Sequence, residues 1–436
     1  MRFIYSLLTR AAAPIAFGVV LWRGVRDRSY WQGLAERFGL GAKLPSPSIW
    51  LHAVSLGEMS AAAPLVRALH TRYPQLALAV TAATPAGRAR ARDLFADVAS
   101  IRFLPYDTPG SVSRFLERIR PCVAVIMETE LWPNLLRECE WRRVPVFLAS
   151  ARLSAKSVSR YRRFGSLFSS VFTPNVTVAA QSAEDAERFR LIGASANQTR
   201  VIGNVKYDLA VSTAIIEAGR VLRAAYGSKL VWAAGSTHAG EEEQVLAAHS
   251  LLQAHRPDSL LLLAPRHKDR FAAVADLLAR RGVKFARRSD MAGALPMDTQ
   301  VLLVDTIGEL MALYASADVA FVGGSLVPIG GHNLLEPAAL GLPVLTGPSH
   351  FNGKEIALLL LRRGAALQVA NPEGLAAALQ RLLDEPAERR RIGDIGKDII
   401  ETNRGSVERL LALIEPSLPE AHQSAAAVAA HPSTER

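Results

Sequence analysis

Short apolar runs alternate with amphipathic helical stretches along most of this 436-residue chain, and this alternation restricts the fold more than any other feature. The runs are rich in Val, Ile and Leu instead of alternating apolar with polar residues, which is typical of parallel strands buried on both faces of a sheet. In the first half we expect strands at residues 49–54, 76–81, 100–104, 122–127, 145–149, 176–180 and 199–202. In the second half we expect them at 230–234, 260–264, 283–286, 301–304, 319–322, 343–346 and 366–369.

This repeated rhythm predicts an α/β protein with two doubly wound, Rossmann-like domains. The length agrees, because the chain is too long for one typical domain. We expect a separate N-terminal helix over 1–22, an N-terminal domain over 23–212 and a C-terminal domain over 213–415. The remaining residues, 416–436, are rich in Ala, Ser, Pro and His and are expected to be disordered. Since ligands bind at the carboxyl ends of parallel strands, the site is expected in a cleft between two facing domains.

The first residues form a distinct segment. Residues 3–22 are largely apolar, are interrupted by Arg10 and Pro14, and precede several arginines. About 20 apolar residues suffice to cross a bilayer, and the cationic C-terminal flank would keep the body of the protein in the cytoplasm. Arg10 also leaves open a helix that lies in the membrane interface. A cleaved signal peptide fits less well, because Arg10 interrupts the apolar region just before the small residues of a cleavage site.

The net charge of +11 predicts acidic partners, such as phosphorylated substrates or an anionic membrane. An Arg-rich surface without any partner is the alternative. No RNP-like, zinc-finger or basic-heptad pattern occurs, so nucleic acid is not expected as a partner. Cys122 and Cys139 lie in an apolar run and in a helical stretch, which indicates reduced thiols in a reducing compartment.

One carboxylate follows the first apolar run, in the sequence HAVSLGEMS, where Glu58 stands three residues after Ser55. This spacing matches a capping box at a helix start. Pro64 argues against it, because a helix begun at Ser55 would carry proline in its interior. The alternative is a loop around Glu58 with a helix from about Ser60, and the local sequence leaves both open.

Further charged residues follow the other expected strands of the first half. Glu128 and Glu130 leave the fourth run two residues apart, so both would face the same side if the strand persists. We expect them to face the cleft instead of forming a surface acidic pair. Lys206 follows the seventh run. A basic segment after the fifth run is either a solvated face or a site for acceptor phosphates, and it contains Arg152, Lys156, Arg160, Arg162 and Arg163.

The second half contains a glycine-rich segment, VGGSLVPIGGHNLLEP, between two expected strands. Glycine permits close backbone approach, and the free N–H groups at a helix start attract phosphates. Asn333 can cap the helix that follows, and Glu336 could complete that cap or accept bonds from a ribose diol. This segment indicates a nucleotide site.

Several chemistries have no motif here. D-x-D, H-E-x-x-H, paired-cysteine, Walker and G-x-G-x-x-G patterns do not occur, and neither does G-x-S-x-G. A metal-independent transferase remains, with the nucleotide in the C-terminal half and a carboxylate base in the N-terminal half.

The chain resembles the 3-deoxy-D-manno-octulosonic acid (Kdo) transferases of Gram-negative lipopolysaccharide synthesis in the segments HAVSLGE, PYD, IMETELWPN, ARLSAKS, GNVKYD, STHAGEE, PRH, DTIGEL and FVGGSLVPIGGHNLLEPAALGLPVLTGP. The resemblance runs to about residue 415. It implies the two-domain GT-B glycosyltransferase fold and the inverting transfer of Kdo from CMP-Kdo to the bisphosphorylated lipid A precursor, lipid IVA. It also implies that no metal or other cofactor is bound. The location implied is the cytoplasmic face of the bacterial inner membrane, held by a single N-terminal anchor and by contacts with anionic lipids.

The resemblance also implies roles for individual residues. Glu58 matches the proton acceptor of the family, and Glu128 and Lys206 match residues that stabilise the transition state. The segments that contact CMP match Pro265, Arg266, Ile307, Gly308, Glu309, Asn333, Leu334, Leu335 and Glu336. The family often has Met in place of Ile307 and Pro in place of Leu334, and both departures are mild. Two alternatives stay open: a GT-B sugar-nucleotide epimerase, which would bind UDP, and a non-catalytic lipid-A-binding protein, which would need no strand-end carboxylates.

Overall fold

The computed structural model describes residues 2–45, 47–209, 211–291 and 293–419. The chain divides into two compact units, and each is described by itself. Unit 1 consists of Met1–Asp208 and Asn403–Arg436, and unit 2 consists of Leu209–Thr402. Most of the tail expected to be disordered, residues 420–436, lies outside the described residues.

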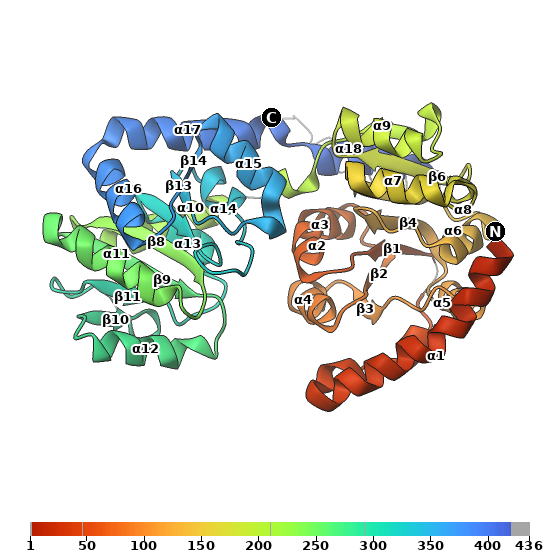
Figure 1. Ribbon diagram of the computed structural model, residues 1–436, viewed down its shortest axis with the longest axis horizontal. Coiled ribbons are helices and arrows are strands. Elements are labelled where there is room, and N and C mark those ends of the chain that lie inside the picture. Colours follow the sequence, from red (N-terminus) through yellow and green to blue (C-terminus); the bar gives the residue numbers. More distant parts are fainter. Residues whose placement is uncertain (1, 46, 210, 292, 420–436) are drawn as a thin grey trace, which may run out of the picture. The chain divides into compact units, whose positions relative to one another are not determined.

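Unit 1 is built on a parallel sheet of seven strands in the order β3-β2-β1-β4-β5-β6-β7 (Figure 1). The strands are β1 (Ser48–His52), β2 (Ala77–Ala82), β3 (Ser100–Phe103), β4 (Pro121–Met127), β5 (Val146–Ala151), β6 (Val176–Ala180) and β7 (Thr199–Val201). Helices flank them: α1 (Arg2–Arg26), α2 (Leu56–Ala61), α3 (Ala63–Arg72), α4 (Pro85–Phe95), α5 (Pro109–Ile119), α6 (Pro133–Trp141), α7 (Ala155–Arg163), α8 (Gly165–Phe168), α9 (Ala183–Leu191) and α18 (Ser406–Ile414).

Both faces of this sheet are buried, which explains why its strands are predominantly apolar instead of alternating apolar with polar residues. Ile49 and Leu51 pack into one apolar core, whereas Trp50, which lies between them, packs into another core on the opposite face. Successive side chains of a strand point to opposite faces, so a sheet covered on both sides needs an apolar residue at each position.

Unit 2 repeats this architecture with the parallel order β10-β11-β9-β8-β12-β13-β14. Its strands are β8 (Leu230–Thr237), β9 (Ser259–Pro265), β10 (Phe285–Arg287), β11 (Val301–Leu303), β12 (Val319–Val322), β13 (Val344–Thr346) and β14 (Ala366–Gln368). Its helices are α10 (Thr213–Ala225), α11 (Glu242–His255), α12 (Arg270–Arg280), α13 (Leu310–Ala315), α14 (Leu335–Ala339), α15 (Lys354–Arg363), α16 (Pro372–Asp384) and α17 (Pro386–Asn403). Every strand expected from the sequence is present in the described residues.

The C-terminal helix α18 returns to unit 1, which differs from the expected domain boundary at residue 415. Its apolar face fills the same core as β1 and β4, and Leu418, just after it, is also buried there. The Asp208 carboxylate accepts hydrogen bonds from the Gly405 N–H at 2.6 Å and the Val407 N–H at 2.5 Å. This cap explains the difference, because it fixes the start of α18 to the last residue of the first chain segment of unit 1.

One face of helix α1 packs against the rest of unit 1. The Tyr5 hydroxyl donates to the buried Asp107 carboxylate at 2.8 Å, and the Ser6 hydroxyl donates to Asn134 Oδ1 at 2.7 Å. Further along the helix, the rings of Phe17 and Phe38 meet edge to face with centroids 5.1 Å apart. Apolar side chains on the rest of the helix remain exposed, including Phe3, Ile4, Leu7, Leu8, Ile15, Val19, Trp22 and Val25. Phe3–Arg26 is long and apolar enough to cross a membrane by composition.

Candidate active site

The chain order of the first sheet changes direction between β1 and β4. From β1 the chain proceeds outward through β2 and β3, and it then returns to β4 on the other side of β1. The loops that leave β1 and β4 therefore diverge, and ligands of doubly wound sheets bind in the crevice between two such loops. Glu58 follows β1 and Glu128 follows β4, so the fold places both predicted catalytic carboxylates at this point.

Glu58 lies in the first turn of the short helix α2, which begins after Ser55. Ser55 Oγ accepts the Glu58 N–H at 3.3 Å and donates to Glu58 Oε1 at 2.9 Å, while the Val54 N–H donates to Oε2 at 2.9 Å. The predicted loop around Glu58 with a helix from Ser60 is therefore wrong. The capping interpretation is close to the structure because the chain starts a second helix, α3, after Ala62, which leaves Pro64 in a first turn where proline is tolerated.

The environment of Glu58 shows that the predicted catalytic residues gather in one cluster. Burial raises the pKa of Glu58, and the hydrogen bond from Val54 opposes this shift. The charge of Glu128 also raises the pKa of Glu58, whereas the charge of Lys206 lowers it. A carboxyl group with a raised pKa is a better proton acceptor than a solvated one once it is ionised.

Glu128 pairs with two cations. Its Oε1 lies 3.0 Å from Lys206 Nζ, and its Oε2 lies 3.4 Å from Arg152 Nε. The backbone of Glu128 has φ 54, a left-handed value that is uncommon outside glycine and typical of functional sites. Lys206 is held in turn, because the preceding Val205 N–H donates to the buried Ser150 hydroxyl at 3.0 Å. Of these two cations, Lys206 also acts on the Glu58 carboxylate, because its charge lowers the pKa of Glu58.

Glu130 is a member of the cluster whose role the sequence did not predict. Its Oε2 accepts the indole N–H of Trp132 at 2.7 Å. Burial raises the pKa of Glu130 to about 7, the Trp132 bond opposes this, and the charges of Glu58 and Glu128 add to the increase. The spacing of two residues between Glu128 and Glu130 predicted that both leave the strand on the same side. Only the tertiary structure shows the burial of Glu130.

The second sheet has its own change of direction, between β8 and β12, and a buried carboxylate joins the loops that follow them. Glu241, after β8, accepts the N–H groups of Gly324 at 2.6 Å, Ser325 at 3.0 Å and Leu326 at 2.9 Å. A Cβ at Gly323 would lie 2.6 Å from the Ser236 carbonyl oxygen, so glycine is required there. The glycine-rich segment is thus a fixed loop at the switch point of the sheet, as expected for a ligand-binding site.

Three histidines line the same switch point. His238 Nε2 and His332 Nε2 are 2.7 Å apart, and their rings are stacked with an interplanar angle of 3°. The ring of His267, after β9, meets the His238 ring edge to face with centroids 5.3 Å apart. We call His238, His267 and His332 the histidine cluster. The sequence did not predict this cluster, because nothing in the local pattern links His238 to His332, 94 positions further along the chain.

The predicted CMP-contacting residues fall into three groups around this sheet. Pro265 and Arg266 end or follow β9, and Ile307, Gly308 and Glu309 precede α13. Glu309 is held by Arg288, whose Nη2 lies 2.7 Å from its Oε1. Asn333 Oδ1 accepts the Leu335 N–H at 3.2 Å, and its amide donates to Glu336 Oε1 at 3.2 Å. The expected cap of α14 by Asn333 differs from the structure, because the N-cap residue is Leu334 and Asn333, one residue earlier, bonds to the first residue of the helix. Leu334 and Leu335 are buried.

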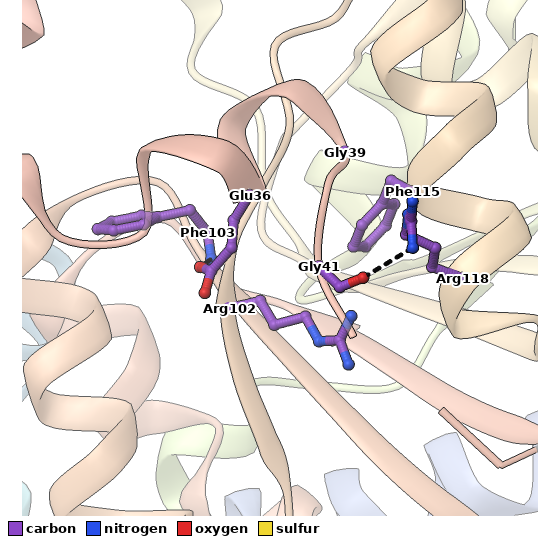
Figure 2. Close-up of a pocket in the computed structure, with 7 residues that line it drawn as sticks. All are labelled: Glu36, Gly39, Gly41, Arg102, Phe103, Phe115 and Arg118. Carbon is purple, nitrogen blue, oxygen red and sulfur yellow. Dashed lines mark hydrogen bonds between the residues drawn. The ribbon is translucent and has the colours of Figure 1, made fainter. Parts of the chain in front are cut away.

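A small pocket lies elsewhere in unit 1 and holds none of the predicted site residues (Figure 2). Its charged groups are already bound within the protein: Glu36 Oε2 accepts the Phe103 N–H at 2.8 Å, and Arg118 donates to the Gly41 carbonyl at 3.0 Å. This pocket is therefore a gap between packed segments of unit 1 whose charged groups already have partners within the protein. Within the described ranges, no group of three or more His, Cys, Asp or Glu residues is placed to hold a metal ion.

Comparison with known proteins gives the family. The family described as 3-deoxy-D-manno-octulosonic-acid transferase (kdotransferase) matches residues 32–209, and that described as glycosyl transferases group 1 matches residues 230–399. The 3-deoxy-D-manno-octulosonic acid transferase of Haemophilus influenzae is 40% identical over 423 residues, which cover 96% of this chain and 99% of the relative. That of Bordetella pertussis is 39% identical over 428 residues, which cover 95% and 99%.

Among solved structures, UDP-GlcNAc 2-epimerase from Neisseria meningitidis bound to UDP-GlcNAc is similar, with a TM-score of 0.53 and 15% identity over 81% of this chain and 99% of that one. At this identity the likeness shows the fold alone, so it gives no support to the epimerase alternative. It agrees with the GT-B fold that two doubly wound units and the group 1 match indicate. With near-full-length relatives at 40% identity, this chain belongs to the Kdo transferases, a family of glycosyltransferase enzymes.

Proposed function

We propose that this chain transfers Kdo from CMP-Kdo to the 6′-hydroxyl of lipid IVA, with inversion at the anomeric carbon and without a metal ion. The observation that carries the proposal is the cluster at the β1–β4 switch point, where the half-buried Glu58 carboxylate lies beside the Lys206–Glu128 ion pair. A single base on the acceptor side is what an inverting displacement requires, since no covalent intermediate with the enzyme forms.

Glu58 acts as the general base in this mechanism. An alcohol attacks only as its proton leaves, and a base within hydrogen-bond reach contributes about 10²–10⁴-fold in rate. Two hydrogen bonds, from Val54 and Ser55, fix the orientation of the carboxylate before the acceptor arrives. Lys206 and Arg152 balance the negative charge of the cluster, so a second carboxylate next to Glu58 does not prevent Glu58 from ionising.

The leaving group is CMP, which gains negative charge on its phosphate as the sugar departs. Arg266, which directly follows β9, is suited to stabilise that charge. Asn333 and Glu336, which are hydrogen-bonded to each other, are proposed to contact the nucleotide.

The acceptor carries two phosphates and lies in a membrane, and two features of unit 1 suit it. The side chains of Lys156, Arg160, Arg162 and Arg163 on α7 are exposed. Near an anionic membrane each such cation contributes about 1 kcal/mol. The exposed apolar side chains of α1 suit insertion into the interface, and the Tyr5–Asp107 hydrogen bond favours a helix lying along the membrane over one that crosses it. We therefore propose that the protein works on the cytoplasmic face of the inner membrane.

The test is to incubate the purified protein with CMP-Kdo and lipid IVA and to measure the products by mass. Addition of one or more Kdo units supports the proposal, and an unchanged rate after EDTA treatment supports its metal-free part. Epimerisation of UDP-GlcNAc without Kdo transfer would refute it.

A further inference from the structure

The histidine cluster lies at the β8–β12 switch point and carries no counter-charge of its own. Among the described residues Arg266 has no carboxylate partner, whereas its neighbour Arg270 is paired with the buried Glu242 at 3.1 Å. The buried Glu241 carboxylate already accepts hydrogen bonds from the glycine-rich loop and from the backbone N–H of His238, the latter at 3.3 Å. The rim formed by Arg266 and the imidazoles is therefore a place where an anion would meet a guanidinium without a carboxylate partner next to imidazole groups that can donate hydrogen bonds.

A structural role in holding a metal does not explain the cluster. The 2.7 Å between His238 Nε2 and His332 Nε2 is a direct hydrogen bond, in which one ring donates and the other accepts. Ser236, two residues before His238, has φ 58, a strained value for a non-glycine residue. This residue lies at an irregularity in the pairing of β8 with β9.

The donor of the proposed function presents two anionic groups close together. In CMP-Kdo the carboxylate of the ulosonic acid and the phosphate oxygen are attached to the same carbon atom. One arginine can neutralise the phosphate, and the carboxylate then needs donors of its own within a few ångströms.

We propose that the histidine cluster is the subsite that recognises the carboxylate of the donor sugar and so distinguishes this donor from nucleotides of neutral sugars. The inference rests on the proposed donor, CMP-Kdo. In the empty site, burial and the charges of Arg266 and the other two histidines hold the pKa of His332 down at about 3. Burial, His267, Arg266 and Arg270 likewise lower the pKa of His238. A bound carboxylate reverses part of this shift, because an adjacent negative charge favours the imidazolium form.

The experiment compares the binding of CMP and CMP-Kdo to the full chain by calorimetry, without acceptor, for wild type, His238→Gln and His332→Gln. Glutamine places an amide nitrogen near the position of Nε2 and preserves hydrogen bonding, but it cannot become charged. We expect each variant to bind CMP within about twofold of wild type and CMP-Kdo at least about tenfold more weakly, which corresponds to about 1.4 kcal/mol. His255→Gln, an exposed histidine at the end of α11, is the matched control and should change neither affinity.

A second readout is the pH dependence of selectivity. The preference of wild type for CMP-Kdo over CMP should rise as the pH falls below the ordinary histidine pKa of about 6.5, and the dependence should weaken in both variants. Equal losses of CMP and CMP-Kdo affinity would show that the cluster only orders the loop, and unchanged affinities would show that it is inert; either result overturns the assignment. If wild type binds CMP but not CMP-Kdo, the proposed function fails as well.

Discussion

Replacing Glu58 by Gln removes the proposed proton acceptor and keeps the shape of the side chain. The Gln side-chain oxygen can still accept the Val54 N–H, and the Ser55 hydroxyl, which now donates to Glu58, can instead accept from the new amide. Only proton acceptance is lost. We expect kcat to fall by at least about 10²-fold, while CMP affinity, which the proposed function assigns to residues of unit 2, stays unchanged.

The same substitution should hardly affect stability. Charge-assisted hydrogen bonds are about twice as strong as neutral ones, so the loss is about 1 kcal/mol. This loss is offset because the ionised carboxylate no longer has to be buried, the effect that raises the pKa of Glu58. A net change within about 1 kcal/mol shifts the melting temperature of a domain of this size by no more than about 2–4 °C.

Ser55→Ala is the matched control, because it damages the local structure and leaves the base in place. Loss of the helix cap costs about 1 kcal/mol, so this variant should melt earlier and still transfer Kdo. The Ser55 bond lowers the pKa of Glu58, so its removal should move the acidic limb of the pH–rate profile to higher pH. The reasoning is refuted if Glu58→Gln retains more than about a tenth of the wild-type rate, because tenfold is only about 1.4 kcal/mol of barrier.

The pKa of Glu130, about 7, means that the folded chain binds more protons than the unfolded chain between pH 4.5 and about 7, so stability should fall as pH rises through this range. In Glu130→Gln, the melting temperature should fall less between about pH 5 and about pH 8 than it does in wild type. An equal fall in both proteins would contradict the assigned pKa of Glu130. Glu241→Ala should cost at least about 3 kcal/mol, since it leaves buried N–H groups of the glycine-rich loop unpaired; a normal melting temperature with normal CMP affinity would contradict this. Glu336→Ala should weaken CMP binding in calorimetry, and tighter binding of UDP than of CMP by wild type would oppose the proposed donor. Deleting residues 1–22 should leave CMP binding intact and lower activity on vesicle-embedded acceptor, whereas full membrane association of the truncated protein in high salt would exclude the anchor.

The local sequence was sufficient for the strands and for the architecture. A strand buried on both faces is apolar at every position, and this signal lies within five to eight residues of chain, so all the expected strands of both sheets are present. The same locality explains why Glu58 and Glu128 could be placed after the strands β1 and β4.

The local sequence left the helix start at Ser55 undecided, because it does not show the break after Ala62 that accommodates Pro64 in the first turn of α3. The return of α18 to unit 1 depends on Asp208, whose cap joins residues 199 positions apart. The periodicity of apolar residues reflects local structure, so it does not reveal contacts between residues that are so far apart in the chain.

The interactions that define the two sites are equally distant in the chain. The sequence by itself determined which residues could do chemistry: an isolated carboxylate after the first strand, an acidic pair after the fourth and a glycine-rich loop in the second half. Only the tertiary structure decided that Lys206 meets Glu128 across 78 residues, that Glu130 is buried enough to hold a proton near neutral pH, and that His238 and His332 share a hydrogen bond. The reason is physical, since charge and burial depend on neighbours brought together by the order of strands in each sheet, and that order is not a local property of the chain.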